Sequence, residues 1–263
     1  MKKIVFLGGG RITSALMAGL RLAGYKQPIV VHDRNPAKLR QLRRRYRVKA
    51  EAELDRALAG ADLLVIAVRP QSVSELLKRI APVRRDLIAV SLAAGIPLAR
   101  LRNQLGAPVR WARAMPSPAC RTGCGLTALT FEKQFPSAGR RVVKNFFAQV
   151  GPVIEIPESK FDAFTVTYSC SHGYHALEAL AEAAVKLGLD NKSAFIAAAH
   201  ALADGILSWR KTRAPLKNLL HEAATPGGIA AAVMNAMNAA GYQGVVERGL
   251  RAGLARTRAN ANL

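Results

Sequence analysis

The chain opens with an apolar run that stops abruptly at three consecutive glycines. Residues 3–7 read Lys-Ile-Val-Phe-Leu, three glycines from Gly8 to Gly10 follow, and apolar residues then recur at helical spacing from Ile12 to Leu22. A strand, a glycine turn and a helix in this order predict a dinucleotide-binding site, because Gly8 permits the tight turn and Gly10 lets backbone N–H groups approach a pyrophosphate.

Further segments of the first half alternate between the two periodicities. We expect strands at 3–7, 29–32, 47–50, 62–68, 87–92, 109–112, 125–130 and 153–156. We expect helices at 12–22, from 35 onward, and at 54–59, 71–80, 97–105 and 137–149. Strands that alternate with helices predict a parallel sheet covered on both faces.

From about residue 158 the sequence becomes rich in alanine and shows few strand signals. Helical spacing runs through 160–187, 192–210, 215–222 and 227–255, and several of these segments are apolar around most of their circumference. Such helices indicate burial in a bundle or in a dimer. The predicted fold class is therefore α/β, with a Rossmann-type domain at 1–158 and an all-helical substrate and dimerisation domain at 159–263.

The cofactor half offers several candidate contacts. The first turn of the helix, with Arg11 and Ile12, presents a positive dipole end to the phosphates. About twenty residues on, Asp33 could accept from ribose hydroxyls and favour NADH, while Arg34 could bind a 2′-phosphate and favour NADPH. We expect NADP(H) first and NAD(H) second. Further candidates at the carboxyl ends of strands are Ala67, Arg69, Pro70, Ala93 and Met115.

The charge of the chain raises a second possibility. It carries 39 Lys and Arg against 17 Asp and Glu, a net charge of +22, and a surplus of this size suggests a nucleic-acid partner. The basic residues are spread over both halves, aromatic residues make up only 6%, and no known nucleic-acid module appears, so we do not expect such a partner. The densest run, residues 40–49, predicts a solvated helix face or a source of positive potential near a nucleotide phosphate.

Weaker sequence signals bear on the cellular location of the protein and on metal binding. No apolar run reaches the roughly 18 residues of a membrane-spanning helix, and the apolar stretch before the glycines is too short for a signal peptide. Three cysteines without paired spacing, Cys120, Cys124 and Cys170, indicate a reducing compartment. We expect a cytoplasmic protein without a membrane partner. His172 and His175 lack a third ligand in view, so we expect no metal.

Four stretches make the chain resemble the pyrroline-5-carboxylate reductase family over nearly its whole length. They are FLGGGRITSAL, DLLVIAVRPQ, SLAAGI followed by RAMPSPA, and ATPGGIAAAV. The resemblance implies a reductase that converts a cyclic imine to an amino acid with NAD(P)H. It also implies a helical domain that dimerises and completes the active site. From the apolar helical half we expect a dimer at least, and a higher oligomer stays open.

The substrate motifs depart from the family pattern. Where the family has Met-Pro-Asn-Thr-Pro, this chain has Met-Pro-Ser-Pro-Ala from Met115. Where the family has Ser-Pro-Gly-Gly-Thr-Thr, this chain keeps one hydroxyl at Thr225 and has Ile229 and Ala230 in place of both threonines. The resemblance implies that those hydroxyls hold the substrate, so the true imine can differ. The substrate contacts carried over are Ser117, Ser171, Thr225, Gly227 and Gly228.

Several polar residues near these motifs could orient or protonate the substrate. We expect Thr225, Tyr174 and His172 to act in catalysis, and Tyr168, His175 and His221 are further candidates. His200, on an apolar helix face, is expected to be a core histidine. Three alternatives stay open: a non-catalytic nucleotide-binding regulatory protein, a β-hydroxyacid-type dehydrogenase with Lys186 as its lysine, and a protein that binds nucleic acid through charge alone.

Overall fold

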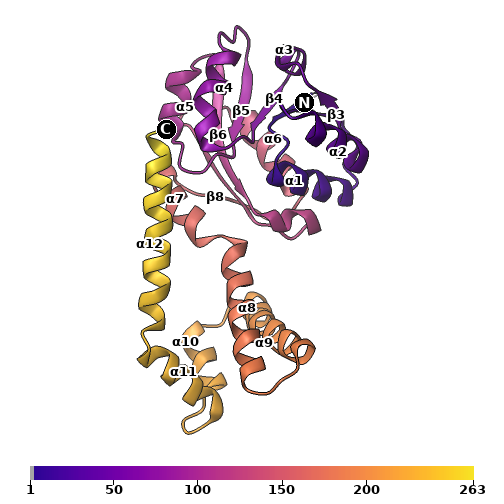
Figure 1. Cartoon of the computed structure of the whole chain (residues 1–263). Coiled ribbons are helices and arrows are strands. Elements are labelled where there is room, and N and C mark those ends of the chain that lie inside the picture. The colour runs from indigo at the N-terminus through magenta and orange to yellow at the C-terminus, as the bar shows by residue number, and fades with distance from the viewer. Residues whose placement is uncertain (1–2) are drawn as a thin grey trace. The chain divides into compact units, whose positions relative to one another are not determined.

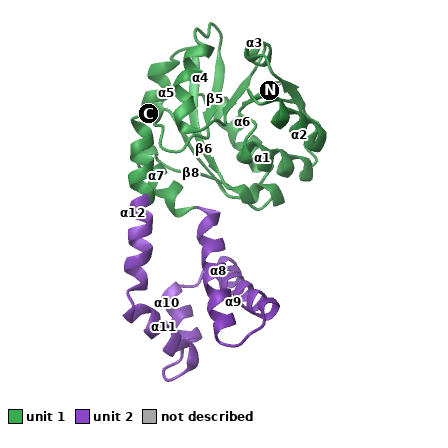
Figure 2. Cartoon of the chain, in the orientation of Figure 1, with its two compact units in different colours: residues 1–168, 253–263 green, residues 169–252 purple. Residues whose placement is uncertain are grey.

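The computed structural model describes residues 3–263 and forms two compact units (Figure 1). Unit 1 consists of residues 1–168 and 253–263, and unit 2 consists of residues 169–252 (Figure 2). We expected a single boundary at 158/159. The division differs because α7 (Glu158–Thr167) forms ion pairs with Arg113 in the sheet of unit 1, and because the last residues of the chain contact the segment that follows β5 (Leu87–Ser91), where Asn260 donates to Ala94 O.

Unit 1 is built on one eight-stranded sheet in the order β3-β2-β1-β4-β5-β6-β7-β8. The strands are β1 (Ile4–Leu7), β2 (Ile29–His32), β3 (Lys49–Glu51), β4 (Leu63–Ile66), β5 (Leu87–Ser91), β6 (Val109–Pro116), β7 (Thr127–Phe131) and β8 (Val153–Glu155). The first six are mutually parallel, which confirms the α/β fold class. β7 pairs antiparallel with β6, and β8 pairs parallel with β7. The expectation of a purely parallel sheet is wrong for this edge, where no helix connects β6 to β7 and the chain turns back through a short 3-10 segment, Pro118–Thr122.

Helices cover both faces of this sheet (Figure 1). On one face Ile4 and Phe6 pack against α1 (Arg11–Leu22), α2 (Pro36–Tyr46) and α6 (Ser137–Ala148). On the other, Val5 and Leu7 pack against α3 (Leu54–Leu58), α4 (Val73–Ile80) and α5 (Leu98–Gln104). Because successive strand residues point to opposite faces, a strand buried on both sides must be apolar throughout. This explains the uninterrupted run at the start of the chain.

Two of the expected helices are interrupted. The segment 160–187 forms α7 (Glu158–Thr167) and α8 (Cys170–Lys186), with Ser169 extended between them and its hydroxyl accepting from Ser171 N at 3.3 Å. The segment 227–255 forms α11 (Ile229–Ala239) and α12 (Tyr242–Ala261), separated at Gly241, whose φ is +78°. An N-cap serine starts a new helix, and a left-handed glycine ends one.

Unit 2 buries little of its apolar surface within the chain. Besides α8 and α11 it contains α9 (Asn191–Thr212), α10 (Leu216–Ala223) and the first half of α12. Its buried cluster is three alanines, Ala181, Ala194 and Ala198. Large apolar side chains stay exposed, among them Phe195, Ile206, Trp209, Val233 and Met237. Within residues 3–263 no helix has the length and hydropathy needed to cross a membrane.

His200 is not a core residue of this chain. It lies on the exposed side of α9, where its Nδ1 is 3.1 Å from Asp204 Oδ2, one helical turn further on. The expectation of a buried histidine is wrong because α9 buries only a narrow line of alanines, so a position between apolar residues is still exposed in a single chain.

A buried arginine joins α7 to the sheet. Arg113, on β6, is 2% exposed and donates to Glu158 Oε1 at 3.2 Å and to Asp162 Oδ1 at 2.8 Å. Its guanidinium carbon also lies 4.5 Å from the centre of the Phe161 ring. Glu158 Oε1 accepts in addition from Leu98 N at 2.6 Å, at the start of α5. This cluster of one arginine and two carboxylates therefore holds α5, α7 and β6 together.

Removing this arginine should destabilise unit 1. We expect Arg113→Gln to cost about 3 kcal/mol of unfolding free energy, because it leaves two carboxylates without their buried partner. This corresponds to a fall of roughly 6–12 °C in melting temperature. The control is Arg251→Gln, which breaks an exposed helical pair with Glu247 and should cost about 0.5 kcal/mol or less. Equal losses in the two variants would contradict the role assigned to Arg113.

Candidate functional site

A cavity of about 740 Å³ lies at the carboxyl ends of β1 and β4. The chain leaves β1 toward β2 on one side and returns at β4 on the other, so the order of strands reverses at this point. Open α/β sheets bind ligands in the crevice that such a reversal creates. The cavity is lined by Leu7, Gly8, Gly10, Arg11, Ile12, His32, Asp33, Arg34, Lys38, Ala67, Val68, Arg69, Ser72, Glu75, Leu76 and Arg79.

The glycine loop takes the shape that its sequence predicts. Gly8 has a φ of +110°, and a Cβ there would lie 2.6 Å from the carbonyl oxygen of Ala67. A Cβ at Gly10 would meet no protein atom within 4 Å, so the space in front of it is open to the cavity. The Thr13 hydroxyl donates to Gly8 O at 2.6 Å and is fully buried. Thr13 thus occupies the third position of the dinucleotide-binding glycine motif and stabilises the turn through this hydrogen bond.

The first turn of α1 is arranged to receive an anion. Gly10 is the N-cap residue and has no side chain that could accept from the helix N–H groups, and no acidic residue lies in the first turn. The N–H groups of this turn have no intrahelical acceptor, and they begin at a residue that lines the cavity. A phosphate placed there would receive both hydrogen bonds and the favourable helix dipole.

Asp33 is engaged with the backbone as well as with the cavity. Its Oδ2 accepts from Gly9 N at 2.7 Å, and its Oδ1 accepts from Asn35 N at 2.8 Å. Lys38 Nζ lies 3.7 Å from Oδ2. The carboxylate therefore ties the end of β2 to the glycine loop, and its remaining lone pairs face a mainly cationic surrounding.

Five basic side chains and two acidic ones line the cavity. Arg34 pairs with Glu75 at 3.5 Å, but both side chains are more than half exposed, so this pair is weak. The excess of cations suits a ligand with several phosphates, including one beyond the pyrophosphate. The basic residues are Arg11, Arg34, Lys38, Arg69 and Arg79.

The structure brings most of the expected cofactor residues together. Gly8, Gly10, Arg11, Ile12, Asp33, Arg34, Ala67 and Arg69 all line the cavity. Three others lie outside its wall: Pro70 begins the 3-10 turn Pro70–Ser72 before α4, Ala93 is 4% exposed behind β5, and Met115 lies on β6. Their contact with a cofactor stays a prediction.

The expected substrate and catalytic residues are divided between the units. Ser117 is buried in unit 1, where its hydroxyl accepts from Ala119 N at 3.1 Å. Ser171, His172 and Tyr174 lie in the first turns of α8 in unit 2, and all three are exposed. Thr225, Gly227 and Gly228 form the α10–α11 loop of unit 2. Their roles in the reaction stay predictions.

The α10–α11 loop is a tight turn of defined geometry. Gly228 N donates to Thr225 O at 2.9 Å, Pro226 occupies the second position and Gly227 has a φ of +78°. Proline at the second position and a left-handed glycine at the third are the signature of a type II turn. Gly228 then caps α11, which leaves the exposed Thr225 hydroxyl and the first N–H groups of α11 on one short segment.

The remaining polar candidates differ in their surroundings. Tyr168 has a structural contact, because its hydroxyl accepts from Leu126 N at 2.8 Å at the start of β7. His175 on α8 and His221 on α10 are exposed. Among the residues that the structure describes, no three His, Cys, Asp or Glu side chains are grouped as metal ligands would be.

Comparison with known proteins matches both parts of the chain to family models. Residues 3–95 match the model described as NADP oxidoreductase coenzyme F420-dependent, and residues 158–260 match pyrroline-5-carboxylate reductase dimerisation. The pyrroline-5-carboxylate reductase of Thermus thermophilus is 34% identical over 261 residues, 95% of this chain and 97% of the relative. That of Mycobacterium leprae is 31% identical over 96% of this chain and 94% of its own length.

The chain belongs to the pyrroline-5-carboxylate reductase family. Two solved structures of the family share its fold: the Plasmodium falciparum pyrroline carboxylate reductase with NADP bound has a TM-score of 0.90 at 21% identity, and the Streptococcus pyogenes enzyme has a TM-score of 0.89 at 22% identity. Each comparison covers 98% of both chains. The resemblance read from the sequence motifs is thereby confirmed.

Several cavity residues escaped the sequence reasoning. Lys38 precedes the basic run at residues 40–49 and was not singled out, but its place in the first turn of α2 brings it to the cavity. Arg79 and Glu75 come from α4, and no local motif marks them. Their position follows from how α4 packs on the sheet, which only the tertiary structure shows.

Two glycine substitutions should separate folding from ligand binding. Gly8→Ala forces a left-handed conformation and a clash with Ala67 O, so we expect it to lose about 1–3 kcal/mol of stability. Gly10→Ala meets no protein atom, so its melting temperature should stay that of the wild type. A methyl group there occupies the space in front of the loop, and NADPH should bind at least about tenfold more weakly by fluorescence titration. Unchanged NADPH affinity in Gly10→Ala would place the pyrophosphate elsewhere.

Proposed function

We propose that the chain is an NAD(P)H-dependent reductase that reduces the C=N bond of pyrroline-5-carboxylate, or of a related cyclic imine, and forms proline or the corresponding cyclic amine. The full-length similarity to curated pyrroline-5-carboxylate reductases carries this proposal. The cavity at β1 and β4 agrees with it, because its open glycine loop and cationic wall fit a dinucleotide. The family assignment replaces the alternative of a β-hydroxyacid-type dehydrogenase, for which Lys186, at the exposed end of α8, had been the candidate lysine.

A nicotinamide cofactor would supply the hydride that such a reduction needs. The chain's own contribution is binding and orientation. The glycine loop and the first turn of α1 would hold the pyrophosphate, Asp33 a ribose hydroxyl, and Arg34 with Lys38 a 2′-phosphate. NADPH is the favoured cofactor, since the cations in the cavity outnumber the acids.

Thr225 is the proposed substrate contact at the α10–α11 loop, with Ser117, Ser171 and the two loop glycines. Ile229, 87% exposed, and Ala230 offer no side-chain hydrogen bond where the family has hydroxyls. A substrate with fewer polar groups at this end would therefore lose less binding free energy from these missing hydrogen bonds than pyrroline-5-carboxylate would. His172 and Tyr174 are proposed to orient or protonate the ring nitrogen.

The proposed assembly is a homodimer or a higher homo-oligomer through the helices of unit 2. Two observations support it: the match to the dimerisation model and the exposed apolar side chains of α9, α11 and α12. A partner surface on these helices would supply the burial that the three-alanine cluster does not. A cytoplasmic location stays a prediction from the cysteine pattern.

The deciding experiment follows the oxidation of NADPH and of NADH by absorbance with pyrroline-5-carboxylate and a panel of uncarboxylated cyclic imines. Turnover of any imine supports the proposal, and the preferred imine identifies the substrate. Tight NADPH binding without turnover of any imine would instead establish a non-catalytic nucleotide-binding protein.

The cofactor preference can be tested by removing the cations beside Asp33. In Arg34→Ala/Lys38→Ala we expect the dissociation constant for NADPH to rise about 10–100-fold, since each charged hydrogen bond contributes roughly 1.5–3 kcal/mol. Binding of NADH, which has no 2′-phosphate, should change by about twofold or less. Fluorescence titration measures both constants. Equal weakening of the two cofactors would show that these side chains do not recognise a 2′-phosphate.

The hydroxyl of Thr225 can be tested with an isosteric change. Thr225→Val removes one hydrogen-bonding group and should lower kcat/KM for the preferred imine about 10–100-fold, corresponding to roughly 1–3 kcal/mol. Thr225→Ser restores the hydroxyl and should recover most of the activity. The NADPH dissociation constant serves as the control and should be unchanged in both variants. Full activity in Thr225→Val would remove this residue from the site.

A further inference from the structure

Helix α2 is held firmly by one side and is charged on the other. Leu39, Leu42 and Tyr46 are buried against the sheet. Tyr46 also contacts α1 twice, through its hydroxyl 3.0 Å from Ser14 Oγ and through its carbonyl oxygen, which accepts from Arg21 Nε at 2.7 Å. The Asn35 side chain accepts from Ala37 N at 2.9 Å and caps the helix N-terminus. The outward face of α2 is thus fixed in orientation.

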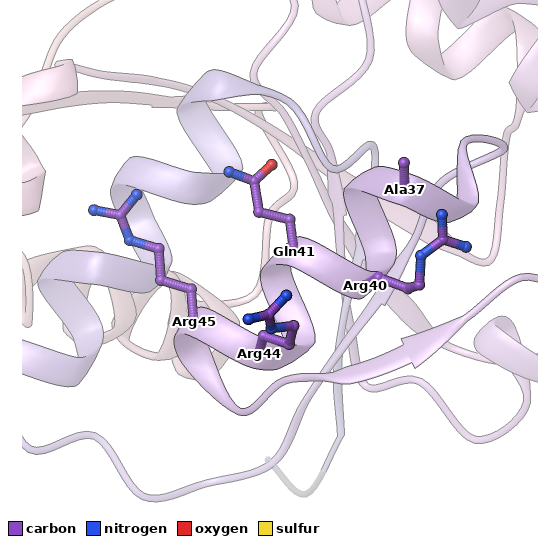
Figure 3. A pocket seen from close by; sticks show the side chains of 5 residues that line it. All are labelled: Ala37, Arg40, Gln41, Arg44 and Arg45. Carbon is purple, nitrogen blue, oxygen red and sulfur yellow. The ribbon is translucent and has the colours of Figure 1, made fainter.

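That outward face carries arginines without acidic partners. Arg40, Arg44 and Arg45 surround a shallow hollow of about 510 Å³, with Ala37 and Gln41 completing its wall. Figure 3 shows the three guanidinium groups spread along the helix rather than gathered on a common partner. Helix α2 contains no acidic residue, and none of the three arginines forms an ion pair with any residue between 3 and 263.

Three further cations precede or begin strands at the amino edge of the sheet. Lys49 begins β3, Lys3 precedes β1, and Arg85 precedes β5 while donating to Ala61 O at 2.6 Å. The pKa of Lys3 is lowered, first by partial burial and then by the charges of Lys49 and Arg85, while the charge of Glu51 acts in the opposite direction. Asp62 and Glu51 are the acidic neighbours of Lys3.

This end of the sheet is opposite to the nucleotide cavity. In parallel strands the amino ends share one edge and the carboxyl ends share the other. Lys49 and Lys3 stand at the amino edge, whereas the glycine loop follows the carboxyl end of β1. Helix α2 runs from the cavity edge, where Lys38 lines the proposed cofactor site, toward the amino edge, so Arg44 and Arg45 in its last turn lie away from that site.

Helix stability alone does not account for the arrangement. Arginines in the last turn interact favourably with the helix dipole, by roughly 0.3–1 kcal/mol each, and Arg44 and Arg45 lie there. Arg40 is a turn earlier, and two like charges four residues apart destabilise a helix by a few tenths of a kcal/mol. A helix selected only for stability would place a glutamate beside them.

The composition of the face distinguishes between classes of partner. A protein interface has an apolar core, and an interfacial membrane helix inserts an apolar face, but the apolar side of α2 is buried and its hollow has no large apolar side chain. Nucleic-acid interfaces are polar and strongly positive, and guanidinium groups bind phosphates in a forked geometry. We propose that the arginine face of α2, with Lys49, Lys3 and Arg85, binds the phosphate backbone of a nucleic acid.

Such binding needs no sequence-reading module, because phosphate contacts alone supply affinity without specificity. We set a nucleic-acid partner aside in part because no known nucleic-acid module appears in the sequence. That argument does not concern binding through phosphate contacts alone. Arg40 and Arg44 are separated by about 6 Å along the helix axis, so the face can contact successive phosphates of a strand. The inference requires no catalysis and goes beyond the proposed reductase function.

The test is fluorescence anisotropy of the full chain with a short labelled DNA duplex over a series of salt concentrations. In Arg40→Gln/Arg44→Gln/Arg45→Gln, the slope of log affinity against log salt should fall in magnitude by roughly 2–3, about 0.9 for each lost phosphate contact. Affinity at low salt should fall at least about tenfold. A duplex of scrambled sequence should bind the wild type equally well.

The matched control removes the same charge from exposed positions elsewhere in unit 1. Arg121→Gln/Arg141→Gln/Arg258→Gln should keep the wild-type slope to within about 1. NADPH affinity should be unchanged in both triple variants, which shows that the proposed cofactor site is intact. The melting temperature of the α2 variant should fall by only a few degrees, because Arg44 and Arg45 each stabilise the last turn by roughly 0.3–1 kcal/mol.

Three results would overturn the inference. One is the lack of any duplex binding by the wild type at low salt. Another is an equal loss in the two triple variants, which would mean that net charge alone is responsible. The third is displacement of the duplex by poly-glutamate as readily as by unlabelled DNA, which would point to an acidic protein partner.

Discussion

The turn from β1 into α1 is the constraint on which the nucleotide half depends. Gly8 can leave the strand at a φ of +110° because it has no Cβ to meet Ala67 O. Thr13 braces the turn from within α1, and Asp33 holds it from β2 through Gly9 N. The helix N-terminus is therefore held toward the cavity by β1, α1 and β2, so the proposed anion site needs little rearrangement to receive a ligand.

The buried Arg113 fixes α7 and the start of α5 to β6, as the glycine turn fixes α1 to β1. Two carboxylates one helical turn apart on α7, Glu158 and Asp162, converge on it, and Glu158 also receives Leu98 N. Taking these charges out of water is costly, and only the paired arrangement offsets the cost. Alternative placements of α7, which would separate the charges, are thereby disfavoured, and this explains why α7 belongs with the sheet rather than with the helices that follow it.

Local sequence patterns predicted the features of the structure that are determined by residues close together in the chain. The apolar runs located all eight strands to within a few residues, the glycine loop identified the cavity, and the motifs identified the family. The reversal of β7, the breaks at Ser169 and Gly241, and the cavity residues Lys38 and Arg79 depend on contacts between distant segments or on single caps within long helical patterns. The two halves of the proposed active site differ in the same way, since a fingerprint locates the first and only a resemblance locates Thr225.

The charge of +22 has two structural components with different consequences. Inside the cavity, cations stand beside Asp33 and Glu75, so the field is local and shaped for a ligand. On the outer face of α2 the arginines have no such counter-charges. Arg44 and Arg45 lie about 10 Å along the helix from Lys38, a distance at which physiological salt screens most of their influence on a phosphate in the cavity. For Arg44 and Arg45, strengthening the cofactor site is therefore a poor explanation, and a partner that contacts them directly is a better one.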